Sequence, residues 1–305
     1  MMQNRNGETK ARRYHVGDQA IIADKQSPGL YVVATPIGNL GDISLRALAV
    51  LAAADVIACE DTRVTARLLD RYGIARPLTP YHDHNAATAR PKLLARLAAG
   101  ETIALVSDAG TPLISDPGYK LVREAVAAGH AVTTVPGASS VMAALTLAGL
   151  PTDRFFFEGF LPPTAGKREK RIAELAAIPA TLVLFETGPR LAASLTDLAA
   201  GLGARETAIC RELTKLHEDV RRGDLSVLAA SASELETRGE FVIVIAPPAD
   251  TTPAEASDVD ALLRQALARV SVKDAVGEVA AATGLKRRDV YQRALALTKA
   301  GTDEP

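Results

Sequence analysis

The sequence predicts an α/β protein with two α/β domains followed by a small helical unit. From Leu30 onward, short apolar stretches alternate with helical periods, and the stretches are nearly continuous in Val, Ile, Leu and Ala. Such strands are typical of a parallel sheet that helices cover on both faces. The chain of 305 residues is also too long for one typical domain. The alternation restarts after Leu150-Pro151-Thr152, so we expect the boundary between the two domains there.

Composition along the chain divides it into five segments. Residues 1–28 carry basic side chains but no apolar core, which predicts a disordered extension rather than a signal peptide, with an organelle-targeting role as the alternative. The two α/β domains are expected at 29–150 and 151–248. A linker rich in Pro, Thr and Ala is expected at 249–257, followed by the helical unit at 258–300.

Hydrophobic periodicity gives the elements of the first domain in order. Apolar runs predict strands at 30–34, 55–59, 102–106 and 131–135. Apolar side chains at turn spacing, such as Leu45, Leu48 and Leu51, predict helices. These helices are expected at 44–54, 62–72, 86–99, 119–128 and 139–148.

The second domain has a less regular order of elements, which predicts a mixed sheet. Strands are expected at 154–158, 180–185, 206–211 and 240–246, with a short extra strand at 216–222, and helices at 166–177, 188–202 and 224–236. Three helical patterns follow between 258 and 299. An amphipathic helix that ends at Thr283-Gly284 and the basic helix after it resemble a helix-turn-helix, although a plain helical bundle fits the pattern equally.

Composition also disfavours several classes of protein. The net charge of -1 gives no overall basic field, so any contact with nucleic acid must come from local patches. Cys59 and Cys210 are far apart and form no CxxC pair, which indicates reduced thiols in a cytoplasmic protein rather than a disulfide or a zinc site. No apolar run is long enough to span a membrane. The glycine-rich fingerprints of NAD and nucleoside triphosphate sites are absent as well.

The stretch Ser107 to Gly118, SDAGTPLISDPG, is the strongest sign of a ligand site. It places two glycines, two prolines and two aspartates between a predicted strand and a predicted helix. Ordinary loops at such a position have only about 2–6 residues. Open α/β sheets bind their ligands where strands run into loops and helices. We therefore expect this loop to contact a ligand.

Nine blocks stand in order between Leu30 and Pro248. They are YVVATPIGNLGDISLRAL, ACEDTR, HDHN, SDAGTPLISDPG, VPGASS, FFFEGFLP, FETGPR, CRELTKLHED and GEFVIVI. Together they resemble the tetrapyrrole methylase-like superfamily of S-adenosylmethionine-dependent methyltransferases, and within it the branch that methylates ribosomal RNA of the small subunit. The resemblance implies two α/β domains with the methyl donor, S-adenosylmethionine, in the cleft between them. It also implies a homodimer that methylates the ribose 2′-hydroxyl of a decoding-centre cytidine in 16S ribosomal RNA.

The resemblance assigns the methyl donor to loops of both domains. The residues implied are Pro36, Gly38, Asn39, Asp108, Ala109, Gly110, Leu113, Ser139, Ser140, Phe185, Glu186 and Thr187. The chemistry is compatible with this assignment, because Asp108 could accept a hydrogen bond from the donor's ammonium group. Backbone N–H groups that glycine leaves accessible, and the helix start at Ser139, would suit the carboxylate of the donor. A simple N-cap is the alternative role of Ser139-Ser140.

Methyl transfer to a ribose hydroxyl needs in-line positioning, and a base or strong acceptor should help because a hydroxyl is a weak nucleophile. The candidates are Asp61, Glu60 and His84, in that order. Acidic residues in a first helical turn are often only partners of the helix dipole, which is the alternative for Glu60 and Asp61. The reaction needs no metal and the His82 to Asn85 cluster offers too few ligands, so no metal is expected.

Local basic or polar groups are the expected contacts to RNA. The candidates are Arg63, Asn85, Lys167, Arg168, Arg211, Lys215, Arg287 and Arg288. The last two belong to the basic C-terminal helix, for which dimerisation is the other expected role. Contacts to phosphate would make the affinity fall with rising salt.

Two other functions fit the same sequence. One keeps the fold and takes a tetrapyrrole of cobalamin or sirohaem synthesis as the methyl acceptor. The other is a non-catalytic module that senses S-adenosylmethionine. The FETGPR and CRELTKLHED blocks and the basic C-terminal helix favour the RNA enzyme.

Overall fold

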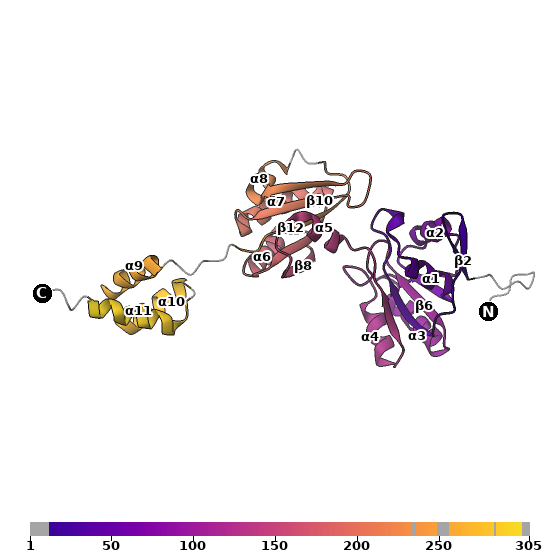
Figure 1. Ribbon diagram of the computed structural model, residues 1–305, viewed down its shortest axis with the longest axis horizontal. Coiled ribbons are helices and arrows are strands. Elements are labelled where there is room, and N and C mark those ends of the chain that lie inside the picture. The colour runs from indigo at the N-terminus through magenta and orange to yellow at the C-terminus, as the bar shows by residue number, and fades with distance from the viewer. Residues whose placement is uncertain (1–11, 233–235, 249–255, 284, 301–305) are drawn as a thin grey trace, which may run out of the picture. The chain divides into compact units, whose positions relative to one another are not determined.

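The computed structural model describes residues 12–232, 236–248, 256–283 and 285–300 (Figure 1). It divides into two units, of which the first ends at Pro247 and contains two five-stranded sheets. We call each of these sheets, with the helices packed on it, a lobe. The second unit contains three helices. Among the described residues, no helix combines the length and the apolar character needed to cross a membrane.

The sheet of the first lobe is entirely parallel. Its strands are β3 (Gly29–Val33), β4 (Val56–Cys59), β5 (Leu78–Pro80), β6 (Thr102–Val106) and β7 (Val132–Val135), in the spatial order β5-β4-β6-β3-β7. Four of them lie where the apolar runs predict them. The three-residue strand β5, with sequence LTP, is too short and too polar to be recognised by periodicity. Because the strands are parallel, the loops that follow them all lie at one edge of the sheet.

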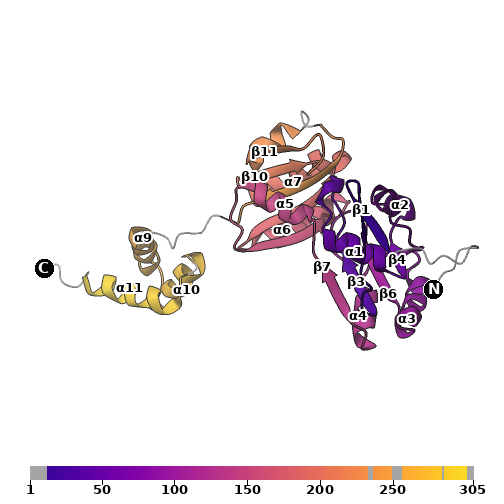
Figure 2. The same cartoon turned by 45° about the vertical axis from the view of Figure 1, so that its right-hand side comes forward.

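Helices cover both faces of this sheet, as predicted (Figure 2). On one face, α1 (Leu45–Ala53) and α2 (Thr62–Arg71) bury leucines against β3, β4 and β6. On the other face, α3 (Ala86–Ala98) and α4 (Tyr119–Ala127) do the same. The one-turn helix η1 (Leu40–Asp42) lies in the loop after β3.

The prediction of a disordered extension up to Pro28 is wrong for residues 12–28. Strands β1 (Arg13–Val16) and β2 (Gln19–Ile22) form an antiparallel hairpin around a Gly17-Asp18 turn. Tyr14 is only 6% exposed and packs in the same core as α1. The strands bury so few apolar side chains that their composition resembles a polar extension, and the two-residue Gly17-Asp18 turn is the one local sign of a hairpin in the sequence. Residues 1–11 lie outside the described part of the chain.

The sheet of the second lobe is mixed, as predicted. Its strands are β8 (Phe155–Phe160), β9 (Thr181–Thr187), β10 (Glu206–Arg211), β11 (Asp219–Asp224) and β12 (Glu240–Ile245), in the order β11-β10-β12-β9-β8. Only β8 and β9 pair in parallel. On one face lie α6 (Ala165–Ala176), α7 (Gly188–Leu202) and α8 (Leu225–Ala230). Helix α8 is shorter than the predicted 224–236, and residues 233–235 lie outside the described part.

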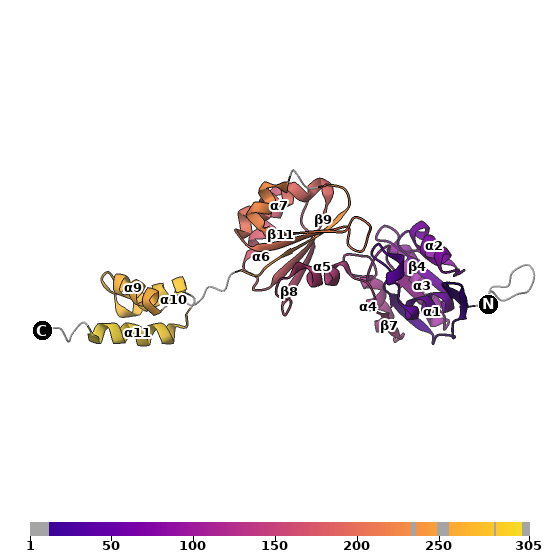
Figure 3. The same ribbon diagram turned by 45° about the horizontal axis from the view of Figure 1, so that its top comes forward.

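Helix α5 (Ser140–Ala148) covers the other face of the second sheet (Figure 3). Val141 and Leu145 pack there against Val183 and Val242. The helix precedes Pro151 in the chain, so the expected boundary at 150/151 marks a turn, whereas the packing boundary lies before α5. The start of α5 therefore lies where the two lobes meet.

The second unit is a bundle of α9 (Ala256–Leu267), α10 (Val272–Thr283) and α11 (Arg287–Ala300) with a hydrophobic core of its own. Val259, Val276 and Val290 contribute one buried side chain from each helix. Helix α9 begins inside the predicted linker 249–257, and the remaining residues 249–255 lie outside the described part. The three helices agree with the three predicted patterns.

Candidate functional site

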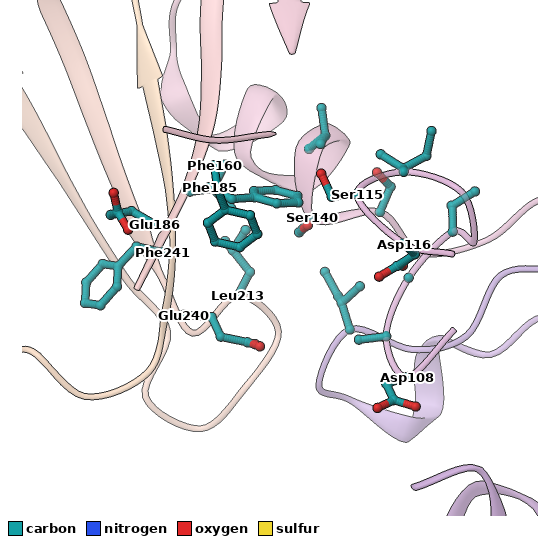
Figure 4. Close-up of a pocket in the computed structure, with 18 of the residues that line it drawn as sticks. Asp108, Ser115, Asp116, Ser140, Phe160, Phe185, Glu186, Leu213, Glu240 and Phe241 are labelled. Carbon is teal, nitrogen blue, oxygen red and sulfur yellow. The ribbon is translucent and has the colours of Figure 1, made fainter. Parts of the chain in front are cut away.

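A cavity of about 280 Å³ lies between the two lobes, at the carboxyl edge of the parallel sheet (Figure 4). The first lobe contributes the loops after β3, β6 and β7, the last of which leads into the start of α5, where Ser140 and Val141 also line the cavity. The second lobe contributes the ends of β8, β9 and β12 and the loop after β10. Parallel strands bring loops that are far apart in sequence to one edge, which is where the sequence predicts the ligand site.

The walls of the cavity differ in chemistry. The second lobe supplies an apolar wall that includes Phe160, Phe185 and Leu213, with the rings of Phe160 and Phe185 edge to face at 5.6 Å. The first lobe supplies a polar wall that includes Asp108 and Asp116. Such a cavity suits a ligand with an aromatic part and a cationic part.

A second hollow adjoins the cavity, since both have Ile37, Asp108, Lys215 and Glu240 among their lining residues. It extends along η1 and α2, where Leu40, Val64 and Arg67 are among the residues that line it. We call the two adjoining hollows together the groove, which lies beside the loops of the first lobe.

The loop Ser107 to Gly118 is held by its neighbours in an unusual conformation. Leu113 and Ser115 adopt positive φ angles of 76° and 62°, which non-glycine residues rarely do. Thr35 and Gly110 exchange backbone hydrogen bonds of 2.8 and 3.1 Å, and the Thr111 hydroxyl donates to the Ala138 carbonyl. Strained backbone that is fixed in this way is a feature of functional sites.

The carboxyl groups of Asp108 and Asp116 belong to this loop, and that of Glu60 lies close to them. The Asp61 backbone N–H donates to Asp108 Oδ1 at 3.0 Å, which joins the loops after β4 and β6. Burial, together with the charges of Glu60 and Asp108, raises the pKa of Asp116 to about 6. Burial and the neighbouring Asp108 and Asp83 raise the pKa of Glu60. The polar wall thus carries negative charge in a partly dry environment.

The segment 212–218, which we call the closing loop, connects β10 to β11 and reaches the first lobe. The Asn39 backbone N–H donates to the Thr214 hydroxyl at 3.1 Å. Lys215 Nζ donates to Glu212 and Glu240, both at 2.9 Å. Gly38 makes this contact possible, because a Cβ at that position would lie 2.5 Å from Lys215 Cγ. The closing loop thus borders the cavity from the second lobe.

The residues expected to bind the methyl donor largely converge on this groove. Eight line the cavity, namely Asp108, Ala109, Gly110, Ser139, Ser140, Phe185, Glu186 and Thr187, and Pro36 and Gly38 line the adjoining hollow. Asn39 and Leu113 line neither. The Asn39 side chain accepts from Gly41 N–H, and Leu113 packs against the core under α3 and α4.

Glu186 and Ser139 hold helices at the site. The Glu186 carboxylate is turned towards α7, where it accepts from the Ser194 hydroxyl at 2.5 Å and from Thr187 N–H at 2.8 Å. Ser139 caps α5, since its hydroxyl accepts from Met142 N–H. Capping and lining the cavity are therefore compatible roles for Ser139.

None of the three expected catalytic residues lines the cavity. Asp61 caps α2 through Arg63 N–H and pairs with the Arg63 guanidinium at 2.6 Å. These contacts lower the pKa of Asp61 to about 2, which makes it a weak base. His84 is exposed and meets His82 edge to face. Glu60 lies close to Asp108 and Asp83.

The prediction that Arg168 contacts RNA is wrong, because its side chain is buried. It donates to Asp197 at 2.6 Å and to the Pro163 carbonyl, and the residue is only 6% exposed. Helical periodicity placed Arg168 among basic neighbours but did not reveal its carboxylate partner on α7.

The other expected RNA contacts divide into engaged and exposed side chains. Arg211 donates to the Arg238 carbonyl, Lys215 pairs within the second lobe, and Asn85 holds a turn between Pro80 and His82. Lys167, Arg287 and Arg288 are exposed, and Arg63 is exposed but also pairs with Asp61.

Sequence reasoning missed several residues of the cavity. Asp116 and Ser115 belong to the loop already singled out, and Phe160, Leu213 and Phe241 belong to blocks that carry the resemblance. The sequence pattern indicates which loop borders the cavity, but not which side chains of that loop face it. Within the described ranges, no cluster of three or more His, Cys, Asp or Glu side chains could hold a metal ion.

Comparison with known proteins gives consistent results. The profile of the family Tetrapyrrole (Corrin/Porphyrin) Methylases matches residues 29–229, and that of the RsmI C-terminal HTH domain matches residues 253–298. Proteins named ribosomal RNA small subunit methyltransferase I are similar over most of their length. The one from Mesorhizobium japonicum is 51% identical, covering 92% of this chain and 96% of that one. The one from Escherichia coli O157:H7 is 44% identical, covering 90% and 96%.

Solved structures share the fold at lower identity. Uroporphyrin-III-C-methyltransferase from Thermus thermophilus has a TM-score of 0.53 and 21% identity, covering 72% of this chain and 94% of that one. A structure of that enzyme complexed with S-adenyl homocysteine has a TM-score of 0.51 and 22% identity, covering 72% and 97%. Profile matches and sequence identities agree, and the chain belongs to the tetrapyrrole methylase family and, within it, to the family of ribosomal RNA small subunit methyltransferase I.

Proposed function

We propose that this chain methylates the ribose 2′-hydroxyl of a decoding-centre cytidine in 16S ribosomal RNA. By family membership it is a methyltransferase that uses S-adenosylmethionine. The observation that carries the proposal is the cavity between the lobes, where aromatic and apolar side chains of the second lobe face the loop that carries Asp108 and Asp116. The partners proposed are the small ribosomal subunit and a second copy of the chain, which also implies a cytoplasmic enzyme.

The residues of the cavity fit the methyl donor. Phe185, Leu213 and Phe241 offer an apolar slot for the adenine ring of the donor, and the carboxylate of Asp108 suits the donor's positively charged end. The capped start of α5 at Ser139 suits a carboxylate, because its backbone N–H groups point outward there. When bound, the donor supplies a methyl group on a positively charged sulfur.

Two observations support RNA as the acceptor. The relatives at 51% and 44% identity are named for ribosomal RNA. The second unit exposes Lys286, Arg287 and Arg288 together at the start of α11, the second helix of its helix-turn-helix. We propose that this surface contacts phosphates, which hold the RNA without reading its sequence.

The test is methyl transfer from labelled S-adenosylmethionine to small ribosomal subunits that lack ribose methylation, followed by digestion of the RNA to nucleosides. We expect label in 2′-O-methylcytidine, and none when the subunits already carry the methyl group. Label in another nucleoside would contradict the acceptor atom. If no RNA were labelled although the protein binds the donor, tetrapyrrole acceptors would be tested next, and failure there would leave a binding module.

A further inference from the structure

Asp116 stands out among the ionisable residues of the cavity. It lines the polar wall, and its side chain points into the space between the lobes (Figure 4). Within the described part of the chain it has no ion-pair partner. Across the cavity lie Phe160, Phe185 and Leu213, so the carboxylate faces a surface that does not hydrate it.

The surrounding structure fixes Asp116 in this place. Ser115 before it has a φ of 62°, and the strand β8 approaches at Gly159, where a Cβ would lie 3.1 Å from Ser115 Oγ. An irregularity in β8 between Phe157 and Gly159 accompanies this approach. The nearby Ser107 hydroxyl lowers the pKa of Asp116 and so offsets part of the effect of burial. A group held this firmly can be oriented towards a reacting atom.

We infer that Asp116 is the general base of the methyl transfer, accepting the proton of the attacking hydroxyl. The inference rests on the proposed function and deepens it. The hydroxyl oxygen forms a bond to the methyl carbon, the carbon–sulfur bond breaks with its electron pair left on sulfur, and the hydroxyl proton passes to Asp116. One positive and one negative charge disappear, so a partly desolvated cavity favours the step.

The other carboxylates near the cavity are less suited to this role. Asp108 already accepts a hydrogen bond from Asp61 N–H, and Glu240 pairs with Lys215. Glu60 does not line the cavity. The Asp116 carboxyl, with its pKa raised to about 6 by burial and by Glu60 and Asp108, is charged at neutral pH and is still a fair proton acceptor.

The experiment compares the wild-type chain, Asp116→Asn and Asp70→Asn in single-turnover methylation of unmethylated small subunits between pH 5 and 8.5. Asp70 is an exposed carboxylate on α2 that does not line the cavity, and serves as the matched control. The groups that face Asp116 are Glu60 and Asp108 from the first lobe, and the Lys215–Glu240 pair lines the same cavity from the second. A cationic donor lowers the pKa further, so the wild-type rate should rise with pH and level off at or below about 6.

We expect Asp116→Asn to slow the transfer by about 100-fold or more and to remove this dependence on pH, while Asp70→Asn behaves as wild type. Calorimetric titration with S-adenosylhomocysteine should give the same Kd for all three. A rate within about twofold of wild type, or an unchanged pH profile, would overturn the inference. Equal loss of rate and of donor binding would also overturn it, because Asp116 would then be a donor-binding residue. Wild-type activity in the same assay reports separately on the proposed function.

Discussion

The partly buried carboxylate of Asp116 lowers the stability of the folded chain at neutral pH. Its carboxyl has a pKa of about 6 in the folded chain against an ordinary value of 3.8, chiefly because it is buried. The folded state therefore holds this proton more tightly than the unfolded state does. Stability contributed by the protonated form is lost as pH rises from 3.8 to about 6, and the charged form is penalised above that range.

Asp116→Asn should consequently stabilise the protein at neutral pH. The rise of the pKa from 3.8 to about 6 corresponds to about 3 kcal/mol of unfolding free energy, which is an upper limit because the Asp116 side chain is only partly buried. We expect a higher midpoint of urea unfolding at pH 7.5, and no gain at pH 3.5, where the wild-type carboxyl is mostly protonated. Equal midpoints at pH 7.5 would show that Asp116 is not penalised by burial.

The basic start of α11 is the clearest charged feature at the scale of an element. Lys286, Arg287 and Arg288 are exposed at a helix N-terminus, where the helix dipole disfavours positive charge and only Asp289 offsets it. An anionic partner would relieve this repulsion. The phosphates of RNA are such a partner, and the free N–H groups of the first turn favour them too.

The double variant Arg287→Ala/Arg288→Ala should weaken binding of small ribosomal subunits. We expect the slope of log affinity against log salt to fall by about one for each phosphate contact removed. The control is Arg264→Ala/Arg269→Ala, which removes the same charge from two exposed positions, one in the last turn of α9 and one just after it. If both variants had the same effect, the contribution would be one of net charge and the α11 surface would not be the contact.

The helices and strands also show how much of the fold can be predicted from the sequence. Strands such as β6 and helices such as α7 lie as predicted, because their apolar periodicity is set by burial against one sheet. The hairpin β1–β2 and the strand β5 escape the same reasoning, because they bury few side chains and depend on neighbours for pairing. Loop composition singled out the segment 107–118, which lines the cavity, because glycine and proline are local signals of an unusual backbone.

Side-chain roles at the site could not be read from the sequence. Asp61 and Asp116 both follow strands and both are acidic, yet one caps a helix beside Arg63 and the other faces the cavity. The difference depends on backbone angles and on partners from other elements. Arg168 illustrates the same point, since only the packing of α6 on α7 brings Asp197 to it.

The cavity is a property of the whole first unit. Neither lobe encloses it, because its polar wall belongs to one sheet and its apolar wall to the other. The lobes share a core in which Ile37 and the apolar side of α5 pack with Leu213 and the strands of the second sheet. The second unit has a separate core of its own.

This division predicts two transitions in calorimetric unfolding, one for both lobes together and one for the second unit. Arg168→Ala leaves the Asp197 carboxylate without its buried partner, so it should destabilise the first transition by about 3 kcal/mol. Lys167→Ala is the matched control, because that neighbour on α6 is exposed.

S-adenosylhomocysteine at about 100 times its Kd should raise the free energy of unfolding of the first unit by about 2.7 kcal/mol and leave that of the second unit unchanged. Separate transitions for the two lobes, with only one shifted by Arg168→Ala, would show that the shared core around α5 does not couple them.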